Sequence, residues 1–78
     1  MDKRLVLEEI VKELVDDSKG VKVEEIIGQS ATVYNIRVSK GDLGKVVGRK
    51  GRIITAIRTI IGSIFAKNDQ KVIIEVND

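Results

Sequence analysis

The spacing of apolar residues switches three times between a helical and an alternating period along this chain. Helical spacing near the N-terminus gives way to two β-branched runs, returns across a glycine-rich middle, and ends in a last alternating run. The predicted elements are a helix over 3–17, strands over 21–27 and 32–38, helices over 43–47 and 52–66, and a strand over 72–76. This α-β-β-α-α-β order favours a two-layer α+β domain.

Residues that favour helix ends mark several of the predicted boundaries. Gly20 suits the left-handed conformation that commonly ends a helix. Asp42 is a good N-cap for the short helix, because an aspartate side chain accepts hydrogen bonds from the first backbone N–H groups. We expect that helix to stop at Gly48.

The order of the elements also predicts how the sheet is assembled. Strands 21–27 and 32–38 are joined by a short turn and are expected to pair antiparallel. The two-helix connection allows strand 72–76 to return parallel to strand 32–38, with a right-handed crossover. We therefore expect a single domain over residues 1–78, in which three helices cover one face of a three-stranded mixed sheet.

The composition excludes several classes of catalytic and metal site. The 78 residues include no cysteine and no histidine, which rules out Cys/His zinc sites and nucleophilic systems that need a thiol or an imidazole. Adjacent acidic pairs do not face each other on a helix or a strand, so none forms an acid–base dyad. We predict a non-catalytic protein without metal or cofactor. No signal-like or membrane-length apolar run is present, which favours a cytoplasmic location.

Positive charge is concentrated in the second part of the chain. Residues 1–30 carry five basic and eight acidic side chains, whereas residues 31–78 carry nine basic and four acidic ones. Between Gly44 and Arg58 there are five cations and no acidic residue. Such a window indicates either an anionic partner or an ordinary solvated face.

The segment Gly48–Gly51 carries the most informative chemistry in this window. Two glycines bracket Arg49 and Lys50 between two predicted helices, and glycine permits positive φ and the close approach of another backbone. The start of the following helix adds unpaired N–H groups and a partial positive charge. The combination predicts a phosphate-binding corner. Its spacing fits neither a P-loop nor a dinucleotide fingerprint.

The flanks of this segment make the pattern specific. Val46–Ile54 places two aliphatic residues before the G-x-x-G and two after Arg52, and this arrangement resembles the hallmark of KH domains. The predicted element order resembles the type II, prokaryotic KH topology over the whole chain. The string from Asp42 to Ile53, with the following Ala-Ile-Arg-Thr, is similar to the small bacterial single-KH RNA-binding family called KhpA.

The resemblance implies non-catalytic binding of single-stranded RNA. KH domains clamp about four nucleotides, with the G-x-x-G loop against the sugar-phosphate backbone. By this analogy, loop residues grip the backbone, flanking cations reach neighbouring phosphates, and two aliphatic side chains together with part of strand 32–38 form an apolar floor for bases. The residues implied are Gly48, Arg49, Lys50, Gly51, Lys45, Arg52, Val47 and Ile54.

Several of these residues also have plainer interpretations. Lys45 and Arg58 can also be interpreted as ordinary solvated cations. Val46 and Ile53 are expected in the core, and Ile54 fits either core or RNA contact. Alternation places Tyr34, with Ile36 and Val38, on one face of the second strand, where Tyr34 is expected to be buried.

The helix predicted over 52–66 carries a second candidate surface. Its apolar arc is wider than a helix on a small sheet needs, and its remaining face is small and uncharged. Small residues allow two helices to approach closely, so we predict a homodimer through this helix. The expected interface residues are Ile61, Gly62, Thr55, Thr59, Ala66 and Phe65.

The resemblance also suggests a biological role and partners. It implies a post-transcriptional regulator or RNA chaperone that self-associates or pairs with a larger KH protein of the KhpB or Jag type, linked to cell shape through envelope growth and division. Two other functions stay open at this point. One is a protein-interaction module with a vestigial G-x-x-G, and the other is a ribosome-assembly factor with a KH fold.

Overall fold

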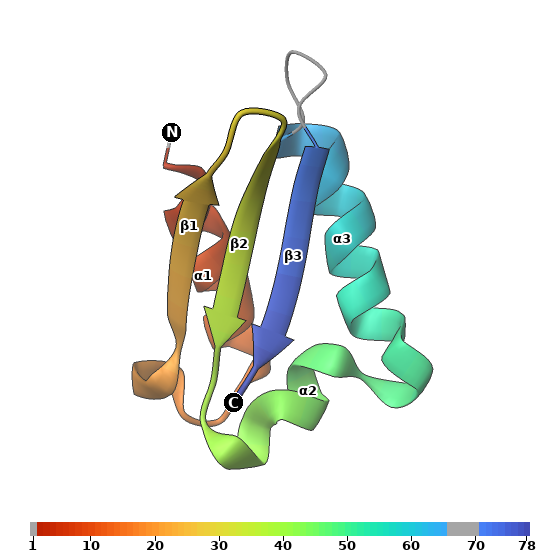
Figure 1. Ribbon diagram of the computed structural model, residues 1–78. Helices are drawn as coiled ribbons and strands as arrows, with labels where there is room; N and C mark the ends of the chain where they lie inside the picture. Colours follow the sequence, from red (N-terminus) through yellow and green to blue (C-terminus); the bar gives the residue numbers. More distant parts are fainter. Residues whose placement is uncertain (1, 66–70) are drawn as a thin grey trace.

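The computed structural model describes residues 2–65 and 71–78, and its element order is the predicted one. The three helices and three strands appear in Figure 1. Their bounds are α1 (Lys3–Leu14), β1 (Lys22–Ile27), β2 (Ala31–Arg37), α2 (Leu43–Val47), α3 (Arg52–Phe65) and β3 (Lys71–Asn77). Short 3₁₀ turns lie at Ser18–Gly20, Lys40–Asp42 and Arg49–Gly51.

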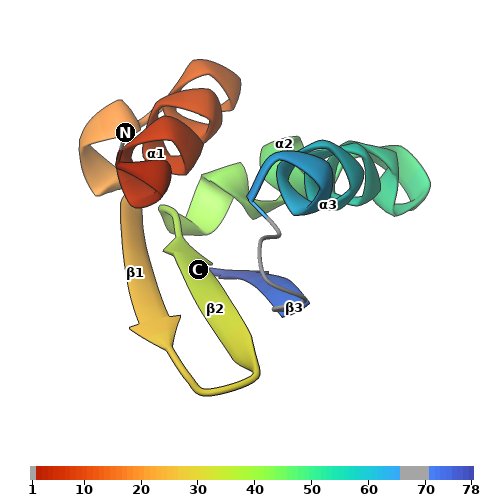
Figure 2. The ribbon, with the colours of Figure 1, turned by 90° about the horizontal axis from the view of Figure 1, so that it is seen from above.

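The sheet has the order β1-β2-β3, with β2 in the centre. β1 pairs antiparallel with β2, whereas β3 pairs parallel with β2 after the two-helix crossover. All three helices lie on one face of the sheet, which leaves the other face open (Figure 2). The prediction of a three-stranded mixed sheet covered on one face by three helices is confirmed, and the architecture is that of a type II KH fold.

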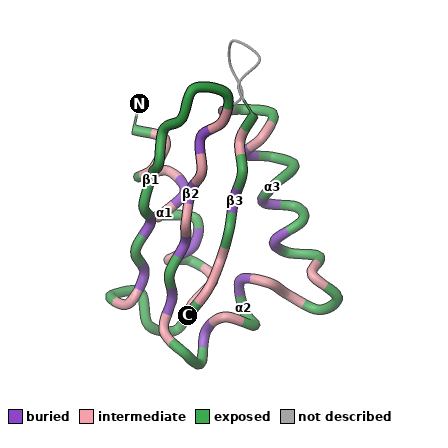
Figure 3. The backbone as a smooth tube through the Cα atoms, viewed as in Figure 1, coloured by how far each residue is buried: buried purple, intermediate pink, exposed green. Residues whose placement is uncertain are grey.

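The core lies between the helices and the covered face of the sheet (Figure 3). Tyr34, Ile36 and Val38 are buried, whereas Arg37 between them is exposed, as their alternation predicts. Burial and a hydrogen bond from the Tyr34 hydroxyl to Glu25 (2.7 Å) raise the pKa of Tyr34. The other buried apolar residues are Leu7, Val11, Val21, Val23, Val46, Ile54, Ile57, Ile61 and Ile74.

The first helix is shorter than its apolar pattern suggests. Asp2 caps its start by accepting hydrogen bonds from the backbone N–H groups of Arg4 and Leu5, at 3.1 and 3.3 Å. The helix ends at Leu14 rather than near residue 17. The apolar period continues to Val15, but the backbone N–H groups of Asp16 and Asp17 donate to a carboxylate that lies beside the start of α2. These bonds draw the chain out of the helix.

That carboxylate belongs to Asp42, which is the N-cap residue of α2 as predicted, but the expectation that its side chain caps this helix is wrong. Asp42 precedes α2 but its side chain makes no cap hydrogen bond there. Instead its two oxygens accept from the N–H groups of Asp16 (3.2 Å) and Asp17 (3.0 Å). These backbone hydrogen bonds, that of Asp17 above all, together with the charge of Lys45 lower the pKa of Asp42 despite its burial.

The prediction of a left-handed Gly20 is also wrong. Among the described residues, the glycines with positive φ are Gly48 and Gly51. A side chain at position 20 would overlap the Ser39 hydroxyl and come within 2.9 Å of an Asp17 carboxylate oxygen, and these two groups are hydrogen-bonded to each other. Gly20 leaves room for this hydrogen-bonded pair, which a Cβ at position 20 would displace.

Candidate nucleic-acid interface

The loop between α2 and α3 begins at a position that only glycine can occupy. Gly48 ends α2, as predicted, and its N–H donates to the Gly44 carbonyl at 2.9 Å. Its backbone has φ +80° and ψ 170°, a conformation that residues other than glycine rarely adopt. A Cβ at this position would also lie 2.5 to 2.9 Å from three side-chain atoms of Ile53. Gly48 is therefore fixed by the internal packing of the loop.

The second glycine of the loop has a different environment. Gly51 donates its N–H to the Gly48 carbonyl at 3.1 Å and has φ +73°. A Cβ there would meet no atom of the described residues beyond its chain neighbours within 4 Å. The residue before it, Lys50, also has positive φ, at 58°. The loop therefore turns sharply, and it leaves bare backbone at Gly51 on the outside of the molecule.

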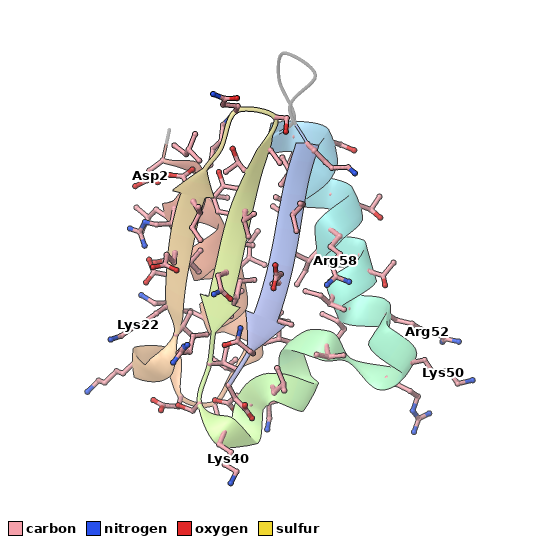
Figure 4. All side chains as sticks on the ribbon, in the orientation of Figure 1. Asp2, Lys22, Lys40, Lys50, Arg52 and Arg58 are labelled. Atoms are coloured by element: carbon pink, nitrogen blue, oxygen red, sulfur yellow. The ribbon has the colours of Figure 1, made fainter. Side chains whose placement is uncertain are left out.

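Three cations surround this turn without protein partners. Arg49, Lys50 and Arg52 are exposed, and no ion pair or side-chain hydrogen bond engages them within residues 2–65 and 71–78. Figure 4 shows Lys50 and Arg52 extending away from the body of the protein. Arg52 also begins the 14-residue helix α3, whose first N–H groups and partial positive charge lie at this corner. The loop therefore presents concentrated, uncompensated positive charge.

Two other cations of the same sequence window are also exposed, but their side chains bond to groups of the protein. The Lys45 ammonium lies 3.3 Å from a carboxylate oxygen of Asp16 and 3.6 Å from one of Asp42. Asp16 in particular raises the pKa of Lys45. Arg58 donates from Nε and Nη2 to the Ile74 carbonyl oxygen, at 3.1 Å each. Lys45 thus serves the contact between α1 and α2, and its charge is balanced by neighbouring carboxylates.

The aliphatic residues around the loop divide between core and surface. Val46 and Ile54 are buried and Val47 is half-buried. Ile53 was predicted in the core, but it is 37% exposed and covers Gly48 instead. The covered face of β2 is packed under the helices. An apolar contact for bases can therefore come from Val47 and Ile53 more readily than from Ile54 or strand 32–38.

The outward side of α3 is a second distinctive surface. Thr55 and Thr59 are exposed and Gly62 is half-buried. The hydroxyls of Thr59 and Ser63 bond to carbonyls four residues earlier in the same helix, at 3.0 Å each, so this side presents few free polar groups. Ile60 and Ile64 beside it are 56% and 55% exposed. By contrast, Ile61 is 1% exposed and belongs to the core. Ala66 lies outside the described residues, as does the side chain of Phe65.

One hollow in the described part of the structure lies away from the loop. It measures about 580 Å³ and is lined by side chains of both charge signs from α1, β1 and β2. Its lining residues are Arg4, Lys22, Val23, Glu24, Glu25, Asn35 and Arg37. Because carboxylates lie beside the cations in this hollow, their charges largely compensate each other. The hollow therefore lacks the uncompensated positive charge of the loop.

Sequence reasoning missed two features of this region. Asp42 joins α2 to residues 25 and 26 positions earlier, and Arg58 joins α3 to β3. The only sequence signal was the lone acidic residue just before a window of cations. Among the described residues there is no cluster of three or more potential metal ligands, and no helix is long and apolar enough to cross a membrane.

Comparison with known proteins adds relatives of similar length. Residues 4–76 match the family model described as the KH domain of KhpA and KhpB. An RNA-binding protein KhpA from Borreliella burgdorferi is 45% identical over 73 residues, which cover 94% of this chain and 89% of the relative. The proteins of that name from Aquifex aeolicus and Clostridium perfringens are 42% and 39% identical, each over 91% of this chain and at least 90% of the relative.

Proposed function

This chain belongs to the KhpA/KhpB family of KH domains, a non-catalytic family, and from that premise we propose that it binds single-stranded RNA through the loop Gly48–Gly51. The observation that carries the proposal is the set of cations that have no partner in the described part of the chain and that surround a turn of bare glycine backbone. The relatives from three distant bacteria are named RNA-binding proteins, which supports the same ligand.

The roles of the loop residues follow from their geometry. Gly51 lets the sugar-phosphate backbone approach the protein backbone, because no Cβ occupies the outside of the turn. Arg49, Lys50 and Arg52 contact phosphates, and Val47 and Ile53 contact the bases. Lys45 is proposed to act indirectly, by fixing the start of α2 against α1. The free cations count against a protein-interaction module with a vestigial loop.

A single domain of this kind is expected to bind weakly. A KH loop holds about four nucleotides, and about three phosphate contacts give a slope of log K against log[salt] near −2 for a single strand. Micromolar affinity, on the order of −8 kcal/mol, is the expected range. Tighter binding then requires two linked sites on one RNA.

We further propose that α3 supplies the second site by forming a homodimer. The small side of the helix, at Thr55, Thr59 and Gly62, allows close approach, and the hydroxyls of Thr59 and Ser63 bond to carbonyls within the helix. The neighbouring Ile60 and Ile64 supply exposed apolar surface. A two-fold axis at this helix places two loops on one assembly. The same surface can serve a KhpB-type partner, consistent with the shared family model.

In this proposal the protein acts in the cytoplasm as a post-transcriptional regulator or RNA chaperone. Its link to cell shape passes through the KhpB or Jag type of partner. Cross-linking the intact protein to RNA in cells and sequencing the bound fragments tests this role. Enrichment of cross-links at Gly48–Gly51 supports it, and recovery of no RNA above background contradicts it.

The dimer has its own test, which uses the space around Gly62. A Cβ at Gly62 meets no atom of the described residues outside its own helix turn within 4 Å, so Gly62→Arg is expected to fold while blocking the close helix contact. Ile61 is unsuitable for this purpose because it is buried in the core. Sedimentation should give a dimer for the wild type and a monomer for Gly62→Arg, with Lys40→Arg as a matched surface control. A monomeric wild type at high micromolar concentration contradicts the interface.

A further inference from the structure

The hydrogen bonds of β3 to its neighbour show which backbone groups of this strand point away from the sheet. Lys71 donates its N–H to the Ser30 carbonyl, and the Asn77 carbonyl accepts from Val38, both at 3.0 Å. Backbone groups of alternate residues in a strand point to the same side. The backbone groups that face β2 are therefore those of residues 71, 73, 75 and 77. The backbone N–H and carbonyl of Ile74 face outward from the sheet.

Arg58 reaches this outward edge from α3. Its Nε and Nη2 atoms each lie 3.1 Å from the Ile74 carbonyl oxygen, so one side of the guanidinium is fixed to the strand. The side chain is seen between α3 and β3 in Figure 4. No carboxylate of the described residues lies within ion-pair distance of it.

Arg58 has a second pair of parallel N–H donors besides the pair bound to Ile74, and we call each such pair a fork. A guanidinium has five N–H groups in one plane, and the bond to Ile74 uses one on Nε and one on Nη2. Nη1 and Nη2 each keep a hydrogen that points away from the side chain, and these two hydrogens are parallel. The anchored fork holds this free fork in a fixed orientation, which lowers the entropy cost of using it.

The free fork lies at a distance from the loop that a bound RNA can span. Arg58 follows Gly51 by seven residues in sequence, which corresponds to about 10 Å along a helix. Four stacked nucleotides span about the same distance, from three steps of about 3.4 Å. A nucleotide string whose phosphates are held at Gly48–Gly51 can therefore bring one base to Arg58.

We propose that Arg58 selects a base with two adjacent hydrogen-bond acceptors at one position of the bound RNA. Guanine presents N7 and O6, and cytosine presents N3 and O2, whereas adenine and uracil have no adjacent pair of acceptors. A bidentate arginine contact to a base edge is worth roughly 5- to 150-fold in discrimination. This inference rests on the proposed RNA-binding function and adds a base preference to it.

The test measures binding of the full-length protein to single-stranded RNA octamers by fluorescence anisotropy. All octamers are uridine except for one central base, which is guanine, cytosine, adenine or uracil, so the strand can slide to bring that base to Arg58. Inosine and 7-deazaguanine are added as probes, because inosine keeps both acceptors of guanine and 7-deazaguanine lacks N7.

The expected result is tighter binding of the guanine or the cytosine octamer than of the adenine and uracil octamers, by roughly 5- to 150-fold. If guanine is the selected base, inosine matches it and 7-deazaguanine does not; if cytosine is selected, the guanine analogues make no difference. Arg58→Lys should reduce the preference to about twofold or less, because lysine is a point charge without a fork. Arg37→Lys, a matched change on the open face of the sheet, should leave the preference intact.

Other outcomes overturn the inference in distinguishable ways. Equal binding of all octamers by the wild type removes the base preference while the RNA-binding function stands. An equal loss for every octamer in a folded Arg58→Lys protein makes Arg58 a phosphate contact instead. Failure to bind any octamer overturns both proposals. If Arg58→Lys does not fold, the octamer and analogue series on the wild type decides the question alone.

Discussion

The two ends of α2 use charge in opposite ways. At its start, Asp42 and Lys45 are joined to each other and to the end of α1, so their charges are paired with groups of the protein. Beyond its end, the loop Gly48–Gly51 and Arg52 carry cations that meet no protein partner among the described residues. The first end holds the helix in place, and we propose that the second presents charge to RNA. Neighbouring cations in one sequence window therefore differ in function because of what they face.

The largest expected effect comes from reversing the charge of the loop. Replacing Arg49 and Lys50 with aspartate should lower RNA affinity on the order of 100-fold, because two favourable phosphate contacts become repulsive. Thermal unfolding should be nearly unchanged, since neither side chain has a partner among residues 2–65 and 71–78. Anisotropy titration and melting curves measure the two effects. A folded double mutant with wild-type affinity would remove the loop from the binding site.

The two loop glycines should separate stability from binding. Gly48→Ala should destabilise the fold by about 2 kcal/mol or more, because the new Cβ enters Ile53 and the backbone is strained. Gly51→Ala carries only the strain of positive φ, about 1–2 kcal/mol, but it fills the space proposed for the RNA backbone. Urea unfolding and RNA titration should rank the variants in opposite orders. Equal effects in both assays would contradict the distinction.

A matched pair of neutral substitutions compares the two ends of α2 directly. Lys45→Gln should lower stability and leave RNA affinity within about twofold, because the ammonium serves Asp16 and Asp42. Arg52→Gln should leave stability unchanged and reduce the magnitude of the salt slope by about 0.7, the value for one lost phosphate contact on a single strand. Titrations at several salt concentrations measure the slope. If Lys45→Gln changes the slope as much as Arg52→Gln, Lys45 also contacts RNA.

The smallest expected effect is a pH dependence at the Asp42 end. Hydrogen bonds from Asp17 and Asp16 lower the pKa of folded Asp42 below its ordinary value near 4. The carboxylate therefore adds stability above that ordinary pKa, and this contribution is lost as the pH falls through the lower, folded pKa. Asp42→Asn should flatten the decline in unfolding midpoint between neutral pH and pH values below about 4. An identical decline in both proteins would assign the acid sensitivity to other carboxylates.

Much of the fold follows from patterns within short segments. The alternation around Tyr34 identified the buried face of β2, and the glycines at 48 and 51 identified the loop and the end of α2. These features depend on residues within a few positions of one another, which is the range over which hydrophobic period and backbone conformation act. The RNA-contact and dimer residues stay predictions, and two of the dimer positions, Ala66 and the side chain of Phe65, lie outside the described residues.

Only the tertiary structure decided which of the similar residues are free. Ile60 and Ile64 lie on the surface of α3 whereas Ile61 is in the core, although all three sit on the same broad apolar arc. Lys45 and Arg58 are engaged by groups 29 and 16 positions away, Asp16 and Ile74. Asp42 likewise bonds to the chain 25 and 26 positions before it, and ends α1 early as a result. Such contacts depend on how distant elements pack, because a charge or a polar group pairs with whatever the fold brings within hydrogen-bond distance. The sequence determined the elements and the loop, and packing determined which charges remain for a ligand.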